Sequence, residues 1–237
     1  MRTISFLSIA FMFFFITGCV KEEMVLPKSL SQEIRSGASG TTTGMKFGKM
    51  TDIDGNVYKT IQIGKQIWMA ENLRVSRFRN GDPVDTYHNG TGFYYYNNDS
   101  ASYNSTFGKM YDIIAVGDAR GLAPKGWHIP KDYEWEQLSN YLGGNSVSGK
   151  KLKSKTGWDG GGDGTDEVGF NGQPAGWANG ALIYFSMTLE AAWWTSTTYP
   201  GQTNFRRFLH YNSDAIHIGT LVYFGDPALN YIRCVKD

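Results

Sequence analysis

Hydrophobic and polar residues alternate along the first part of the chain, with the period of β-strands. In residues 57–63 the alternation places Val57, Ile61 and Ile63 on one face. An Asp-Gly pair just before this run has the chemistry of a tight hairpin turn, and a second glycine turn leads into an apolar run at residues 66–69. We therefore expect an antiparallel hairpin here.

The period becomes helical after Pro130, where Trp135, Leu138 and Tyr141 follow one another at intervals of three. Proline is tolerated at a helix entrance, and two glycines stop the pattern. The sequence predicts one main helix over residues 131–142. We expect a second, short helix over residues 148–154.

The residues that enter the main helix are interpreted as framework. Trp127 and Trp135 are expected to clamp the helix to the sheet. His128 is expected to be a packed, hydrogen-bonded side chain rather than a catalyst.

Short apolar runs separated by turn residues fill the C-terminal part, as in an antiparallel meander. These runs are residues 192–197, 205–211, 215–218, 221–224 and 231–235. The pattern as a whole predicts an α+β fold of mostly short antiparallel strands, one main helix and long loops.

Composition supports a β-rich domain and excludes one class of partner. The chain has 237 residues, with 29 glycines and 15% aromatic residues, which favours short strands, tight turns and an aromatic core. The net charge of +1 gives no reason to expect a nucleic-acid partner.

The N-terminus has the pattern of an export signal. Arg2 supplies a positive start, residues 4–16 are apolar, and small residues precede Cys19. This resembles the bacterial lipobox, which implies cleavage before Cys19 and a lipid on its thiol. The alternative is an ordinary secretory signal with an incidental cysteine.

We accordingly expect three parts: a lipoprotein signal peptide at 1–18, a flexible tether at 19–46 and a folded domain at 47–237. The membrane is the first expected partner, through the lipid. The short charged run at 21–23 resembles signals that send some Bacteroidota lipoproteins to the cell surface. The expected location is the bacterial outer membrane, lipid-anchored and surface-displayed.

Cys234 is the only thiol left if Cys19 carries a lipid, so no internal disulfide can form. It lies in a β-rich run, and we expect it to be a small apolar core residue rather than a nucleophile.

Two aromatic stretches are candidate ligand-binding residues. Tyr94, Tyr95 and Tyr96 follow a phenylalanine, and alternate strand residues point to opposite faces, so some are expected to be exposed for stacking sugars or docking proteins. Trp158 begins the second stretch. The alternative is a strand that is buried on both sides.

Two acidic stretches are candidate calcium loops. Asp159, Asp163, Asp166 and Glu167 lie on a glycine-rich backbone and could supply oxygen ligands. The alternative is a solvated acidic loop, and no cofactor is certain. The first residues of 52–63 also match a calcium-loop opening, but the twelfth position is isoleucine, so a turn is preferred there.

We find no catalytic constellation in the sequence. The histidines at 88, 128, 210 and 217 have no metal-ligand spacing, although His210 and His217 lie on neighbouring expected strands and could meet. Glu134 and Glu136 are two apart on a helix and face different directions, so they make no acid/base pair.

Seven motifs in order resemble the Fibrobacter succinogenes major paralogous domain family. They are Asp52-Ile-Asp-Gly-Asn-Val-Tyr-Lys-Thr-Ile-Gln-Ile-Gly64, Trp68-Met-Ala-Glu-Asn-Leu73, Gly121-Leu-Ala-Pro-Lys-Gly-Trp-His-Ile-Pro130, Glu134-Trp135, Gly164-Thr-Asp-Glu-Val-Gly-Phe170, Trp194-Thr-Ser-Thr197 and Ile232-Arg-Cys-Val-Lys-Asp237. The resemblance covers the chain from Asp52 to its end and implies a secreted or lipid-anchored bacterial protein, without a defined biochemical role.

The segment from Gly126 to Trp135 also resembles the Arg-Leu-Pro-Thr-Glu-Ala-Glu-Trp motif of formylglycine-generating sulfatase modifiers, which implies a C-type-lectin-like fold. Their copper and cysteine chemistry is not carried over, because Lys131 replaces the capping threonine and Cys234 is the one thiol of the expected domain. The Trp-Asn-Asp and Glu-Pro-Asn triplets of a lectin calcium site are missing as well.

We therefore expect a lipid-anchored binding or adhesion module for an extracellular glycan or protein. One alternative is a metal-dependent enzyme related to the sulfatase modifiers, with His210 and His217 as ligands. The other is a structural component of a surface assembly.

Overall fold

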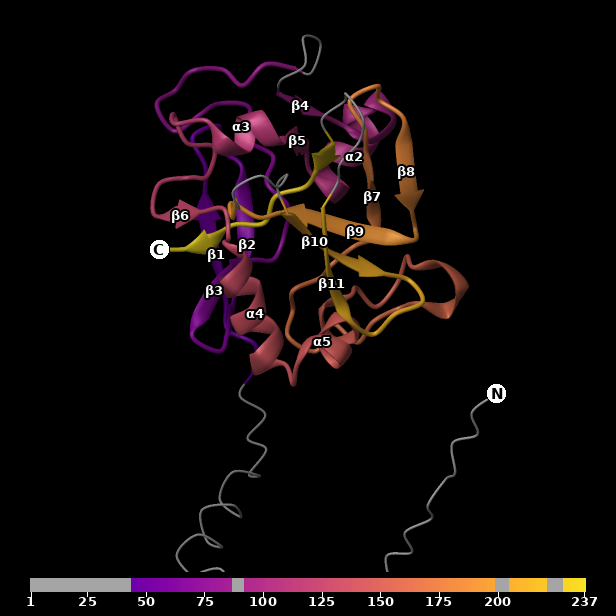
Figure 1. Cartoon of the computed structure of the whole chain (residues 1–237). Helices are drawn as coiled ribbons and strands as arrows, with labels where there is room; N and C mark the ends of the chain where they lie inside the picture. The colour runs from indigo at the N-terminus through magenta and orange to yellow at the C-terminus, as the bar shows by residue number, and fades with distance from the viewer. Residues whose placement is uncertain (1–43, 87–91, 199–204, 221–227) are drawn as a thin grey trace, which may run out of the picture. The chain divides into compact units, whose positions relative to one another are not determined.

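The computed structural model describes residues 44–86, 92–198, 205–220 and 228–237 (Figure 1). In these ranges most strand pairs are antiparallel and the helices are few and short, so the predicted α+β class is confirmed. None of the helices described is long and apolar enough to cross a membrane. Cys19, His88 and the run at 221–224 lie outside the described residues.

The first sheet brings the two ends of the described domain together. Its strand order is β1-β2-β3-β13-β6, so the last strand lies between β3 and β6. Its members are β1 (Phe47–Thr51), β2 (Val57–Ile63), β3 (Gln66–Met69), β6 (Trp127–His128) and β13 (Val235–Lys236). The hairpin predicted from alternation is confirmed, because β2 and β3 pair antiparallel through the second glycine turn.

The turn between β1 and β2 is organised by one carboxylate. Asp52 Oδ1 accepts hydrogen bonds from the backbone N–H groups of Asp54 and Asn56, both at 2.9 Å, and Oδ2 accepts from Tyr58 Oη at 2.6 Å. Gly55 has φ of 82°, which a side chain would strain. The acidic residues therefore form a turn here, as preferred from the sequence.

The second sheet has the order β11-β10-β9-β7-β12-β5-β4 in the described part, and β8 pairs with β7. Its members are β4 (Phe93–Tyr94), β5 (Met110–Asp112), β7 (Ala175–Ala178), β8 (Tyr184–Met187), β9 (Glu190–Trp194), β10 (Phe205–His210), β11 (Ile216–Thr220) and β12 (Leu229–Asn230). Strands β7 and β9 are parallel, whereas the other pairs of this sheet are antiparallel.

The main helix is confirmed as α4 (Asp132–Tyr141), and the short one as α5 (Asn145–Leu152), which begins three residues before its expected start. A buried ion pair between Asp132 and Arg207 ties the start of α4 to β10, with Oδ2 and Nη2 2.7 Å apart. The other α-helices are α2 (Ser100–Phe107) and α3 (Ile113–Gly117), and two 3-10 turns are η1 (Tyr96–Asn98) and η2 (Asp159–Gly161).

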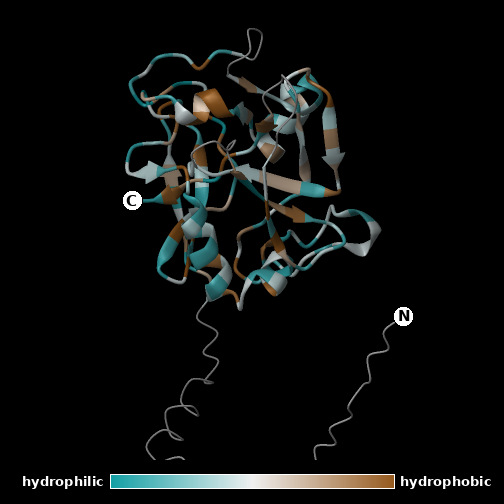
Figure 2. Ribbon diagram, viewed as in Figure 1, coloured by the Kyte–Doolittle hydropathy of each residue, from teal (hydrophilic) through white to brown (hydrophobic). Residues whose placement is uncertain are grey.

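A tryptophan cluster joins α4 to both sheets. Trp135 lies with its ring centroid 4.7 Å from that of Trp68 on β3 and 5.6 Å from that of Trp193 on β9. Phe170 packs edge-on against all three. These side chains are fully buried, and Figure 2 shows the contrast between brown positions on the central strands and the mostly hydrophilic α4.

A second hydrophobic cluster lies on the opposite face of the first sheet, and it corrects one expectation. Trp127 packs there with Tyr58 and Cys234, whereas Trp135 belongs to the first cluster. The two tryptophans therefore do not clamp α4 together, because Trp135 of α4 packs on one face of the sheet while Trp127 of β6 points to the other. Cys234 is a core residue as expected, and burial raises the pKa of its thiol well above the ordinary value.

Candidate functional site

The segment that connects β6 to α4 is fixed at both of its ends. Gly126 has φ of 79° and Trp127 N donates to Pro124 O at 3.0 Å, which turns the chain into β6. At the helix entrance Glu134 Oε2 accepts from Lys131 N at 2.9 Å, and Thr197 Oγ1 accepts from Asp132 N at 2.7 Å. The side chains of this segment are thus presented from a rigid support.

His128 lies between two carboxylates. Its Nδ1 is 2.7 Å from Asp237 Oδ1, and its Nε2 is 2.9 Å from Glu134 Oε1. Burial alone lowers the pKa of His128, but the hydrogen bonds to Asp237 and Glu134 outweigh it and raise the pKa above its ordinary value. Both ring nitrogens are used, so the imidazole has no free nitrogen with which to bind a metal or accept a proton.

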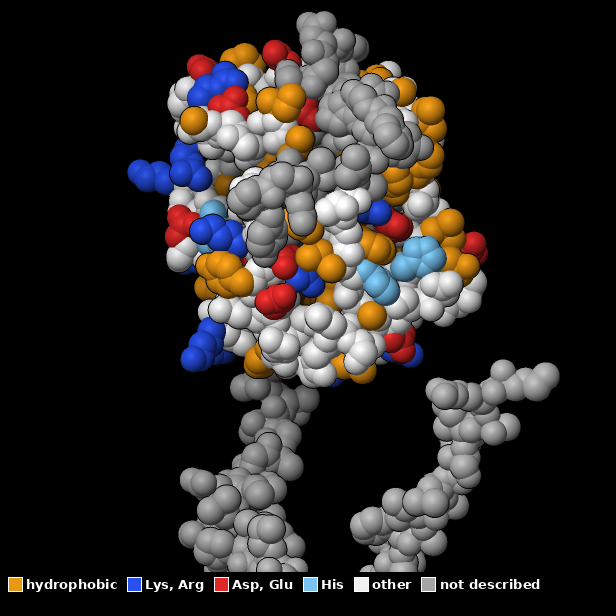
Figure 3. Space-filling model, in the orientation of Figure 1, with side chains coloured by type: hydrophobic (Ala, Val, Ile, Leu, Met, Phe, Trp, Pro, Cys, Tyr) orange, Lys and Arg blue, Asp and Glu red, His pale blue; other side chains and the backbone are white. Residues whose placement is uncertain are grey.

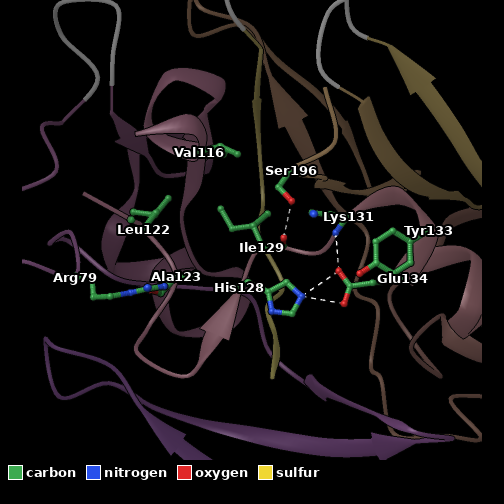
Figure 4. A pocket seen from close by; sticks show the side chains of 11 residues that line it. Arg79, Val116, Leu122, Ala123, His128, Ile129, Lys131, Tyr133, Glu134 and Ser196 are labelled. Carbon is green, nitrogen blue, oxygen red and sulfur yellow. Dashed lines mark hydrogen bonds and ion pairs between the residues drawn. The ribbon is translucent and has the colours of Figure 1, made fainter. Parts of the chain in front are cut away.

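An open cavity of about 430 Å³ lies beside this histidine, within the size range of small-molecule sites. Its lining residues are Arg79, Val116, Gly121, Leu122, Ala123, His128, Ile129, Lys131, Tyr133, Glu134 and Ser196. Figure 4 shows Arg79 on one side of the cavity and Lys131 with Tyr133 on the other, with Leu122, Val116 and Ile129 between them. The cavity therefore combines an apolar wall with polar ends.

The two cations at the ends of the cavity have no carboxylate partner among the described residues. Arg79 donates only to backbone oxygens, from Nε and Nη2 to Ala123 O at 3.1 and 3.0 Å and from Nη2 to Trp127 O at 3.1 Å. These bonds orient the guanidinium and leave Nη1 unused in the described part of the chain. The exposed Lys131 ammonium is unengaged in the same ranges.

Ser196 completes the wall between the helix and the second sheet. Its Oγ donates to Ile129 O at 2.8 Å, and its backbone N–H donates to Pro130 O at 2.9 Å. Arg79 also borders a neighbouring cavity of about 340 Å³ that shares Leu122 and Ala123. A ligand longer than one ring could therefore extend from one cavity into the other past Arg79.

The tyrosines expected to be exposed are mostly inside. Tyr94 and Tyr96 are each 7% exposed, so the expectation is wrong for both, and Tyr95 is half-buried. Tyr96 packs against Tyr103 and Tyr184, because β4 and η1 are covered by α2 and β8 on both sides. The alternative of a strand buried on both faces describes them better.

Trp158 is also buried, so it too lacks the exposure expected of a stacking surface. Its Nε1 donates to Ser154 Oγ at 3.1 Å, and the ammonium of Lys153 lies 5.2 Å from its ring centroid. Trp158 thus anchors the acidic loop to the core.

The acidic loop does not gather its carboxylates. Asp163 accepts from Trp158 N, Asp166 from Asn171 N and Asp159 from the next backbone N–H, while Glu167 pairs with a lysine of α5. Within the described ranges, no three acidic, histidine or cysteine side chains converge as metal ligands. The calcium expectation for this loop is therefore not supported, because each carboxylate is directed at a different local donor.

His210 and His217 lie on the same face of neighbouring strands, as the sequence suggested, since Phe208 is opposite His217 in the register. Their side chains have different hydrogen-bond partners. His210 Nδ1 is 2.6 Å from Asn212 Oδ1, and His217 Nε2 is 2.8 Å from Ser213 Oγ while its ring stacks on Phe208. Burial and the charge of His210 lower the pKa of His217.

Charged side chains of both signs are scattered over the face shown in Figure 3, in keeping with the net charge of +1. Sequence reasoning placed His128 and Glu134 correctly at the helix entrance but missed Arg79, Lys131 and Asp237 as its neighbours. His128 and Asp237 are separated by 109 positions, and Arg79 comes from a turn-rich segment without periodicity. The pairing of β6 with β13 brings Asp237 to His128, and Arg79 is held nearby by its bonds to Ala123 O and Trp127 O, so no local signal connects these residues.

These features define a small α+β domain with an open, partly cationic cavity at a strand-to-helix junction. The sequence model of the Fibrobacter succinogenes major domain matches residues 61–236. The chain belongs to this family, and the resemblance drawn from the seven motifs is confirmed. Comparisons with curated proteins and with solved structures give no match. The family description itself specifies no reaction and no ligand.

Proposed function

We propose that the chain is a binding module and that the cavity beside His128 is its ligand site. The observation that carries this proposal is the pair of cations, Arg79 and Lys131, at opposite sides of an apolar wall without carboxylate partners in the described residues. An oriented guanidinium with a free N–H is suited to a carboxylate, sulfate or phosphate oxygen.

The ligand class that fits this arrangement is an acidic glycan. A sugar ring offers an apolar face to Leu122 and Ile129, and its acidic substituent can reach a cation at the end of the cavity. The hydroxyl of the exposed Tyr133 is available for a sugar hydroxyl. The cavity is open, so a chain of sugars can extend beyond it.

Binding is preferred to catalysis because the groups with acid or base character are already engaged. Glu134 accepts from His128 and from Lys131 N, and Asp237 accepts from the other ring nitrogen of His128. A general base needs a free lone pair within reach of the substrate. The groups left free around the cavity are donors, which suits recognition of an anion.

Two finer assignments belong to the same proposal. We assign the fold to the C-type-lectin-like type, supported by the meeting of β1–β3 with β13 in one sheet and by the β6–α4 junction. We also assign a lipid to Cys19 and a place at the surface of the bacterial outer membrane, supported by the N-terminal pattern. Labelled palmitate incorporated by the wild type and not by Cys19→Ser is the expected result, and equal labelling would reject the anchor.

The ligand proposal is tested with an array of acidic and neutral glycans, followed by calorimetry on any hit. We expect uronic-acid, sulfated or phosphorylated glycans to bind, and Lys131→Gln or Arg79→Gln to weaken binding about tenfold or more, since a charge-assisted hydrogen bond contributes about 1.5–3 kcal/mol. The matched control is Lys155→Gln, an exposed lysine outside the cavity lining.

Three outcomes would reject the proposed ligand class. They are a blank array with folded protein, preference for neutral glycans, and equal losses in the Lys131 and Lys155 variants. Binding only of acidic peptides in a parallel array would assign the same cavity to a protein partner instead.

A further inference from the structure

One half of a face of the first sheet is left uncovered by the residues that the structure describes. Alternation and register place Phe47, Lys49 and Thr51 of β1 on the same face as their partners Ile61, Lys59 and Val57 of β2. At one end Ile61 is buried, 1% exposed, in the cluster around Trp135. Phe47 and Val57, by contrast, are 54% and 52% exposed.

The positive charges on this uncovered face repel one another. Lys49 lies directly opposite Lys59 in the antiparallel register, and neither forms an ion pair in the described part of the chain. Like charges directly opposite on neighbouring strands are destabilising. The carboxylate of Glu71 accepts from the backbone N–H of Lys59 and pairs with Arg74 instead. The face therefore carries two uncompensated positive charges between two exposed apolar side chains.

A shallow hollow of about 360 Å³ lies on this face and is lined by Phe47, Gly48, Lys49 and Lys59. Strand β1 is also an edge strand of its sheet (Figure 1). The hollow is thus open at the margin of the domain.

We propose that this face, Phe47, Lys49, Val57 and Lys59, rests on an anionic lipid bilayer surface. Basic side chains interleaved with apolar ones match the boundary of a bilayer. There the basic groups contact headgroup phosphates and the apolar side chains contact acyl chains. Exposed lysines near an anionic bilayer contribute electrostatic attraction, and Phe47 and Val57 contribute apolar burial.

The chain before β1 favours this occupant over a soluble one. The sequence predicts a flexible tether over residues 19–46, and a flexible segment of that length spans roughly 30 Å between its ends on average. If Cys19 carries a lipid, β1 is the first described strand beyond that anchor and is held near the bilayer at a high effective concentration. This inference is independent of the ligand proposed for the cavity, because it uses other residues.

The test is vesicle flotation of the chain from residue 19 onward with Cys19→Ser, so that neither the apolar segment at 4–16 nor an acyl group contributes. We expect it to bind vesicles of phosphatidylethanolamine with phosphatidylglycerol and to be released by high salt. The double variant Lys49→Gln with Lys59→Gln should bind about 25-fold more weakly, since each lysine near such a surface contributes about fivefold. Phe47→Ser should bind about tenfold more weakly.

The matched control is Lys150→Gln with Lys236→Gln, which removes two exposed lysines, one on α5 and one on β13. It should change binding by no more than about twofold, because its charges lie on another side. Thermal unfolding of every variant verifies that the domain is folded. Absence of vesicle binding by folded protein at low salt, or equal losses in the two double variants, overturns the proposal. Self-association that Phe47→Ser abolishes, without vesicle binding, assigns the face to a second copy and overturns it as well.

Discussion

The cations of the core are buried, whereas Arg79 and Lys131 at the cavity are exposed. In the core, Arg233 donates to Asn72 Oδ1 at 3.1 Å and to backbone oxygens of Phe170 and Asn171, and its guanidinium lies 4.3 Å from the centroid of the Phe170 ring. It has no carboxylate partner in the described residues. Around the cavity, His128 has two carboxylate partners and Lys131 has none.

Two further buried lysines follow the pattern of Arg233. Lys153 Nζ lies 3.0–3.3 Å from three backbone oxygens of residues 210–213. Lys109 donates to Ser76 Oγ, and its Nζ lies 3.9 Å from the centroid of the Phe93 ring. These three buried cations therefore bind uncharged oxygens and rings, which fixes loops to the core. The buried Arg206 and Arg207 instead pair with Glu190 and Asp132.

We call the buried cations with fixed partners structural, and the exposed cations at the cavity available, because only the latter can bind a ligand. A buried donor with fixed oxygen partners cannot leave them without a large loss, because those oxygens would have no water to replace it. An exposed donor at a cavity exchanges water for a ligand at little loss. Three predictions test this difference, beginning with the largest effect.

Arg233→Met should reduce the free energy of unfolding by about 3–5 kcal/mol, because it leaves the backbone oxygens of Phe170 and Asn171 without this donor and removes one of the two donors to Asn72 Oδ1. The matched change at the cavity, Arg79→Met, should reduce the free energy of unfolding by no more than about 1 kcal/mol. Water from the open cavity can reach the oxygens of Ala123 and Trp127 that Arg79 binds. Urea denaturation measures both.

If Arg233→Met does not fold, Arg233→Lys supplies the comparison, with an intermediate loss expected. Equal losses at positions 233 and 79 would contradict the distinction between structural and available cations.

Lys109 should give stability a pH dependence in the alkaline range. Burial lowers its pKa to about 8, although Asp54 and Asp52 oppose the shift. Between that value and about 10.4, the unfolded chain binds the proton that the folded chain has released, so stability rises with pH. We expect unfolding free energies measured from pH 8 to 9.5 to rise by about 1 kcal/mol more in the wild type than in Lys109→Met. Parallel curves would show that Lys109 stays charged in the fold.

His128 should act in the opposite direction and more weakly. Its folded pKa is raised, so the stabilisation by Glu134 and Asp237 is complete below about pH 6.5 and is lost as pH rises through the folded value. His128→Gln should therefore cost no more than about 1 kcal/mol at pH 5.5, because the site is partly exposed, and less at pH 8.5. Chemical denaturation at both values checks this, with His217→Gln as the control. A larger loss of unfolding free energy at pH 8.5 than at pH 5.5 would contradict a His128 pKa that the fold raises.

The elements that the sequence predicted are those with a local cause. The β2–β3 hairpin follows from alternation and glycine turns, and α4 follows from the spacing of Trp135 and Leu138 after a proline. The exposure of Tyr94 and Tyr96 was misjudged, because it depends on the covering by α2 and β8, which come from distant parts of the chain. The arrangement of the acidic loop could not be predicted for a related reason, since composition does not reveal that each carboxylate finds its own donor.

The sequence by itself determined the family, the mixed fold class, the main helix and the burial of Cys234. These features depend on residue type and on spacings of a few positions, so residues close together in the sequence are sufficient to determine them. Only the tertiary structure decided that Trp127 and Trp135 serve opposite faces of one sheet, and that Arg79, Asp237 and Lys131 surround His128. The physical reason is that β13 enters the first sheet between β3 and β6, and strand order has no signature in local periodicity.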